Sequence, residues 1–155
     1  MLPQLNFPDY KFKIILQGKD GQSSKIFDIV RRKYVSCSAE EWVRQHLLHF
    51  LVFEKEVPKS LIGIEKKVLV NNLFKRTDLV VYNRQAKPLL IAECKAPSVK
   101  ITQETFDQAA RYNLSLNAKY YLLTNGLQHF FCTIDHVSKS YHFLENIPDF
   151  QFLLD

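Results

Sequence analysis

The feature that most constrains this chain is an apolar run at residues 89–92, which is followed at once by Glu93, Cys94 and Lys95. An unbroken apolar run of this length suits a strand that is buried on both faces of a sheet. Pro97 has no N–H to donate, so it ends the pairing. Side chains two apart in a strand point to the same side, so we expect Glu93 and Lys95 to lie side by side and Cys94 to point away. Charges at the end of a buried strand are costly unless they are paired or metal-bound, so this stretch is a candidate functional site.

Length and composition indicate one globular domain over residues 1–155. The 21 basic and 16 acidic residues give a net charge of +5, which suits a polyanionic partner but is also common in proteins that never meet nucleic acid. The three cysteines, Cys37, Cys94 and Cys132, are far apart, which favours reduced thiols, a cytoplasmic location and no zinc knuckle. We also expect no membrane span, because no apolar run is long enough.

Hydrophobic periodicity predicts a twisted mixed sheet with helices packed against it, an α/β fold of the α+β type. The expected elements are strands over 11–17 and 24–35, a helix over 39–53, strands over 61–70, 74–82 and from 89, a helix over 103–116, and strands over 120–124 and 129–134. We expect the three central strands to form an antiparallel meander and Asn125-Gly126 to join a hairpin. The flanks are an N-terminal arm and hairpin over 1–24 and a less patterned C-terminal extension over 136–155, which we expect to pack back on the core.

The densest basic run is Arg31-Arg32-Lys33, at the end of the second predicted strand. The simpler interpretation, which we favour, is a solvated strand edge that its charge keeps soluble. The alternative is an edge that contacts phosphate groups.

Two carboxylates, Asp78 and Glu93, lie on successive predicted strands and could meet at one end of the sheet. Paired carboxylates repel each other and need a cation nearby, for which Mg²⁺, with its preference for oxygen ligands, is the natural choice. Lys95 could then hold an attacking water or offset charge in the transition state. Taken singly, each residue has a simpler role: Asp78 could pair with Arg76, and Glu93 with Lys95 as a surface salt bridge.

The spacing of Asp78, Glu93 and Lys95 resembles the active site of the PD-(D/E)xK nuclease superfamily. The wider context is similar to the N-terminal domain of type I restriction enzyme R subunits, especially its short stand-alone versions, over about residues 25–135. The segments that carry this likeness are 41–45, 76–82, 91–97, 108–113 and 123–126. The resemblance implies a restriction-endonuclease-like mixed β-sheet flanked by helices.

The resemblance also implies roles for the central residues. Asp78 and Glu93 would bind Mg²⁺, with Mn²⁺ as a substitute, and the backbone carbonyl of Cys94 would be a further ligand. Lys95 would be the catalytic base or the group that orients water. Thr77 stands where the motif's name has proline, a change that the superfamily tolerates.

Further positions match the family's outer site. An acid on the first helix joins the metal shell in the family; Glu41 matches it best and Glu40 second, although Glu41 also fits a capping box with Ser38. Gln108 and Tyr112, four apart on one helix face, would contact the substrate, and Arg76 is a third candidate for that contact.

These observations predict a Mg²⁺-dependent endonuclease domain, related to restriction-modification, that hydrolyses DNA phosphodiester bonds. The sequence has no phosphate-binding loop of a helicase motor, so we expect a helicase or specificity subunit to act in trans, and a homodimer would suit cleavage of two strands. The main alternative is a catalytically idle DNA-binding or partner-docking module with a nuclease fold. A weaker one is a purely structural domain.

Overall fold

The computed structural model describes residues 2–19, 21, 23–70, 72–113 and 117–153, apart from the side chains of residues 70, 112, 152 and 153. In chain order its elements are β1 (Ile14–Gln17), β2 (Ser23–Asp28), β3 (Lys33–Ser36), α1 (Ala39–His49), a π-helical turn (Phe50–Glu54), a 3-10 turn (Lys59–Leu61), β4 (Ile62–Ile64), β5 (Lys67–Val70), β6 (Leu73–Arg76), β7 (Leu79–Tyr82), β8 (Pro88–Cys94), α2 (Gln103–Asn113), β9 (Tyr120–Thr124), β10 (His129–Asp135), β11 (Ser140–Leu144) and α3 (Phe150–Leu153).

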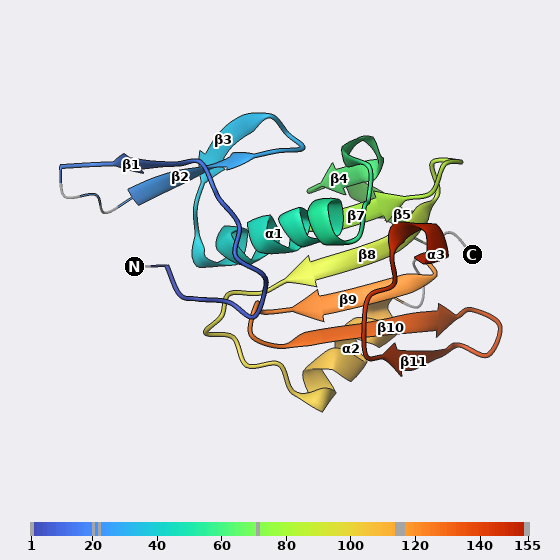
Figure 1. Cartoon of the computed structure of the whole chain (residues 1–155). Coiled ribbons are helices and arrows are strands. Elements are labelled where there is room, and N and C mark those ends of the chain that lie inside the picture. The colour runs from blue at the N-terminus through green and yellow to red at the C-terminus, as the bar shows by residue number, and fades with distance from the viewer. Residues whose placement is uncertain (1, 20, 22, 71, 114–116, 154–155) are drawn as a thin grey trace.

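The main sheet has six strands in the order β11-β10-β9-β8-β7-β4. Its neighbours pair antiparallel except β8 and β9, which are parallel and are joined across the sheet by α2. This arrangement confirms the predicted α+β, restriction-endonuclease-like class, the central meander of β4, β7 and β8, and the hairpin at Asn125-Gly126 (Figure 1).

Two apolar clusters form because β8 is buried on both faces, as its composition predicts. Leu90 and Ala92 pack in one cluster with Leu47 of α1, whereas Ile91 packs in the other with Phe106 of α2. The two long helices therefore cover opposite faces of the sheet, and β8 lies at its centre.

A three-stranded sheet, β1-β2-β3, projects from the body beside the start of α1 (Figure 1). The sequence pattern predicted one strand over 24–35, but the chain turns between β2 and β3. The Asp28 carboxylate accepts the N–H groups of Val30 (2.9 Å) and Arg31 (2.6 Å), and Arg32 adopts a φ of 54°. A short polar side chain that captures nearby backbone N–H groups favours a turn over a continuous strand.

The predicted strands over 61–70 and 74–82 are each divided in the same way. Glu65 has a φ of 53°, and opposite it the Thr77 N–H and hydroxyl both donate to the carbonyl of Lys66, at 2.9 and 3.0 Å. The two breaks face each other, so β5 and β6 leave the main sheet as a separate hairpin. Because of this bend, Lys75 reaches Glu93 and Arg76 reaches Glu65.

The two ends of the chain pack on the body. Leu5 is buried in the α1-side cluster and the Asn6 N–H donates to the Gly126 carbonyl at 2.7 Å, so the N-terminal arm lies along the surface as expected. The extension packs back through Phe150, as predicted, but it also forms β11 and α3, which the pattern had not indicated. In the part of the chain that the structure describes, no helix is long and apolar enough to cross a membrane.

Candidate active site

Asp78 lies immediately before β7 and contacts both the central strand and the first helix. Its Oδ2 accepts the backbone N–H of Cys94 at 2.8 Å, and its Oδ1 lies 3.5 Å from Nη2 of Arg44. The pairing of Leu79 with Ala92 brings the start of β7 to the end of β8, which is why this carboxylate reaches Cys94. The side chain is 26% exposed, so one side of it faces solvent at the sheet's end.

Glu93 is partly buried and is paired with a lysine from another sheet. Lys75 Nζ lies 3.0 Å from Glu93 Oε1 and also donates to Asn113 Oδ1 at 2.9 Å. The neighbouring Tyr121 hydroxyl has a raised pKa because it is buried and, next in importance, because the Glu93 carboxylate is close; Asp78 contributes as well. One buried hydroxyl therefore senses the charge of both predicted metal-binding carboxylates.

Lys95 follows β8 directly, and its charge acts on Glu40 at the start of α1. The pKa of Glu40 is raised by burial and then by the Asp78 carboxylate, while Arg44 and Lys95 act against this rise. The carboxylates of Glu40 and Asp78 and the ammonium of Lys95 are therefore within electrostatic range of one another. Asp78 therefore acts electrostatically on Tyr121, beside Glu93, and on Glu40.

Glu41, the better sequence match for the helix acid, is buried in a network of cations. Its Oε1 accepts from Arg31 Nη2 at 2.9 Å and its Oε2 from Arg44 Nη1 at 3.0 Å, and Gln45 also donates to it. Its N–H donates to the Ser38 hydroxyl at 3.1 Å, which confirms the predicted helix cap. Glu40, the second sequence match for the helix acid, is the one whose pKa responds to Asp78 and Lys95. Glu41 instead binds Arg31 and Arg44.

The predicted substrate-contacting residues are spread more widely. Arg76 lies 3.1 Å from Glu65 and its side chain is 66% exposed. Gln108 is exposed on α2. The side chain of Tyr112 lies outside the described residues, so its role in substrate contact stays a prediction.

Three contact residues at this site were missed by sequence reasoning: Arg44, Lys75 and Asn113. Arg44 carried a usable signal, because it follows Glu40 by four residues and Glu41 by three on one helix. Lys75 and Asn113 carried none, because they reach Glu93 only through the bend before β7 and the packing of α2.

The donor set at the sheet's end suits a hard divalent cation, since Asp78, Glu93 and the carbonyl of Cys94 all offer oxygen. Within the described residues, however, no group of three or more His, Cys, Asp or Glu side chains is arranged to hold a metal. The two carboxylates instead pair with Arg44 and Lys75. The residues thus fit the ion by donor type, and in this structure Arg44 and Lys75 are the cations paired with the two carboxylates.

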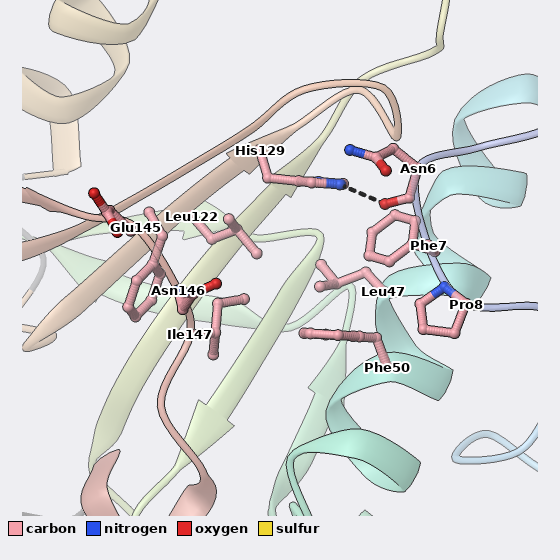
Figure 2. Close-up of a pocket in the computed structure, with 11 residues that line it drawn as sticks. Asn6, Phe7, Pro8, Leu47, Phe50, Leu122, His129, Glu145, Asn146 and Ile147 are labelled. Carbon is pink, nitrogen blue, oxygen red and sulfur yellow. Dashed lines mark hydrogen bonds between the residues drawn. The ribbon is translucent and has the colours of Figure 1, made fainter.

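A separate cavity of about 130 Å³ lies where the N-terminal arm crosses α1 and the β9–β10 hairpin. Figure 2 shows Phe7 and Pro8 of the arm beside Leu47 of α1, and the bond of 2.8 Å between His129 Nε2 and the Asn6 carbonyl. None of the carboxylates described above lines this cavity, so it belongs to the docking of the arm.

A mixed sheet covered by a helix on each face, with acids at the end of its central strand, defines a restriction-endonuclease-like α+β domain. The chain belongs to the family described as type I restriction enzyme R protein N terminus, whose model matches residues 39–148.

A solved fragment assigned as an HsdR subunit of a type I restriction enzyme from Vibrio vulnificus YJ016 is similar at 19% identity, with a TM-score of 0.43. The match covers 67% of this chain and 23% of that one, so this chain corresponds to a small part of that protein. None of the curated protein sequences matches this chain.

Proposed function

We propose that this chain is a metal-dependent nuclease domain that hydrolyses DNA phosphodiester bonds. The observation that carries the proposal is the position of Asp78, whose Oδ2 accepts at 2.8 Å from the N–H of Cys94, the residue between Glu93 and Lys95. An acid just before β7 thereby reaches the end of the central strand, where Glu93 and Lys95 flank Cys94. Membership of a restriction-enzyme family supports a role in restriction-modification.

In this proposal Asp78, Glu93 and the backbone carbonyl of Cys94 would hold Mg²⁺, with Mn²⁺ as a substitute, and Glu40 would take the outer position first assigned to Glu41. The bound ion would supply a more acidic water and stabilise negative charge on phosphorus. Lys95 would hold the attacking water, whose oxygen forms the new bond to phosphorus, while the leaving oxygen takes up a proton.

The test is cleavage of supercoiled, linear and single-stranded DNA in Mg²⁺ or Mn²⁺. We expect Asp78→Asn, Glu93→Gln and Lys95→Ala each to lose activity by about 100-fold or more, as is usual for removal of a group that acts in the transition state. Glu104→Gln on the exposed start of α2 is the matched control. Equal rates for the wild type and all three site variants would refute the proposal.

A second candidate function is a DNA-binding or partner-docking module that does not turn over. The ion pairs of Arg44 with Asp78 and of Lys75 with Glu93 favour it, because each carboxylate already has a cation. Titration calorimetry separates the two: a nuclease site takes up Mg²⁺ in a manner that Asp78→Asn abolishes, whereas a purely docking module shows no such heat. A helicase or specificity subunit would act in trans in either case, and a homodimer would suit cleavage of two strands.

A further inference from the structure

The positive charge of this protein is concentrated in one projecting element. Residues 11–36, which we name the basic wing, hold seven Lys or Arg and two Asp, and this balance equals the net charge of +5 of the whole chain. The wing comprises β1, β2 and β3 and precedes residue 39, where the family match begins. The rest of the chain is therefore neutral overall, and the wing is an addition to the family domain.

A groove of about 550 Å³ lies between the wing, the segment before it and the end of the first helix. Four cationic side chains line it: Lys11, Lys13, Arg32 and Lys59. No Asp or Glu lines it among the described residues; Glu54 acts on Tyr10, whose pKa burial and this carboxylate raise, and Asp28 acts on His49. A concave surface with this charge concentrates anions.

Aromatic side chains alternate with these cations in the groove. Tyr10, Phe27 and Phe53 line it, and Phe53 is 57% exposed, an unusual position for a phenylalanine. The Tyr10 and Phe53 rings have centroids 6.4 Å apart, and Lys13 Nζ lies 5.5 Å from the Phe27 ring centroid. An exposed ring, here Phe53, beside cations is the combination that binds a base by stacking while the cations hold the phosphates.

The groove is built on a fixed support. The buried carboxylate of Asp28 accepts from Arg31 Nε at 2.8 Å and from Gln45 Nε2 of α1 at 2.9 Å, and so ties the β2–β3 turn to the helix. The Arg32 N–H donates to the Asp28 carbonyl at 2.8 Å, which sets the direction of this residue. Since the supporting bonds are already formed, little ordering is needed when a ligand binds.

We propose that this groove binds a single-stranded nucleic-acid segment, with Lys11, Lys13, Arg32 and Lys59 against phosphates and Phe53 stacked on a base. A single strand is specified because in a duplex the base faces are stacked on one another and cannot reach Phe53. The site is separate from the carboxylates at the end of β8, so the proposal goes beyond the nuclease function and does not require it.

The experiment measures fluorescence anisotropy of the full chain with 12-nucleotide oligothymidylate and oligouridylate, in EDTA and at several salt concentrations. We expect Lys11→Gln/Lys13→Gln to weaken binding at least tenfold at 50 mM salt and to reduce the salt slope by about 1.4, which is about 0.7 for each lost phosphate contact. Phe53→Ala is expected to weaken binding by about 5- to 100-fold, and the preferred strand identifies DNA or RNA as the source. The matched controls are Lys139→Gln and Phe74→Ala, at exposed positions outside the groove, which should leave affinity unchanged.

Three outcomes would overturn the proposal. If a duplex of equal length binds more tightly than either single strand, Phe53 does not stack on an unpaired base. An unchanged affinity for Phe53→Ala, with loss only in the lysine variant, shows a charged patch without stacking. An equal loss for Phe74→Ala places the stacking elsewhere. Because EDTA removes divalent ions, an inactive metal site has no effect on any of these results.

Discussion

The ammonium of Lys75 lies 3.0 Å from the Glu93 carboxylate and 2.9 Å from the side-chain oxygen of Asn113. Lys75 belongs to β6, outside the main sheet, and Glu93 to the central strand β8. The outer hairpin therefore supplies a cation to the carboxylate that the proposed metal ion would use. An internal ammonium at this position competes with a divalent ion for the same charge.

Replacement of Lys75 should tighten metal binding. In Lys75→Met the Glu93 carboxylate loses its partly buried partner, so we expect the Mg²⁺ concentration for half-maximal binding to fall by about tenfold, equivalent to about 1.4 kcal/mol. Titration calorimetry checks this, with Lys67→Met on the exposed face of the same hairpin as the control. Weaker Mg²⁺ binding in Lys75→Met would mean that Lys75 supports the site rather than competes for it.

Glu40 and Glu41 should separate function from stability. Glu41→Gln removes the buried carboxylate that bridges Arg31 and Arg44, and we expect the free energy of unfolding in urea to fall by about 2–4 kcal/mol. Glu40→Gln, whose side chain is 44% exposed, should change stability by less than about 0.5 kcal/mol and instead lower metal-dependent cleavage. Equal loss of stability in the two variants would contradict the division of roles.

Three histidines whose pKa is lowered in the folded chain should make the fold less stable in mild acid. Burial lowers the pKa of His46, His49 and His129 below 6.5, against the opposing effect of their bonds to backbone carbonyls. Between the folded and unfolded pKa values the unfolded chain binds more protons, so stability is complete above about pH 6.5 and declines as the pH falls below it. We expect Tm to drop by a few degrees between pH 7.5 and 5.5, since about 1 kcal/mol corresponds to about 2–4 °C at this size.

The matched variants for that measurement are His129→Gln, whose ring bonds to the Asn6 carbonyl, and His142→Gln, at another exposed position. His129→Gln should flatten the dependence of Tm on pH, whereas His142→Gln should retain the slope of the wild type. A slope that is the same in all three proteins would show that His129 does not contribute to the acid sensitivity.

Two glycines allow backbone strain to be distinguished from crowding. Gly126 has a φ of 84°, and a Cβ there would lie 2.9 Å from Leu5 Cδ2 and 3.1 Å from Val43 Cγ2. Gly21 has a φ of 62° and nothing within 4 Å. Gly21→Ala should cost about 1 kcal/mol from conformation alone, whereas Gly126→Ala should cost about 2–4 kcal/mol because it also displaces the N-terminal arm. Urea unfolding measures both, and equal losses would show that the arm adds no crowding.

Local signals predicted most of the elements correctly. The two helices, the Ser38 cap, the central meander and the hairpin at Asn125-Gly126 all depend on periodicity or turn chemistry within a few residues of the chain. The strands that were predicted too long failed at Glu65 and Arg32, where the chain takes a positive φ. Neither residue type signals such a conformation: at Arg32 it follows from the Asp28 turn, and at Glu65 from a bond to the distant Asp78 carbonyl.

The residues of the candidate site likewise include some that the sequence predicted and some that it did not. Asp78, Glu93 and Lys95 could be selected from the sequence because charges interrupt apolar strands there, and the bond from the Cys94 N–H to Asp78 joins the strand starts and ends that carry them. The assignment of Glu41 over Glu40 rested on spacing alone. Which of two adjacent helix residues faces the sheet's end depends on how α1 is rotated, and the arginine network of Glu41 is part of that packing.

The sequence by itself determined the family, the central buried strand and the residue types available for chemistry, because these follow from pattern and composition along the chain. Only the tertiary structure decided that Lys75 reaches Glu93, that Arg44 reaches Asp78, and that the basic wing and Phe53 share one groove. These contacts join residues that are far apart in sequence. Their geometry is set by backbone bends and helix packing, for which no local pattern exists.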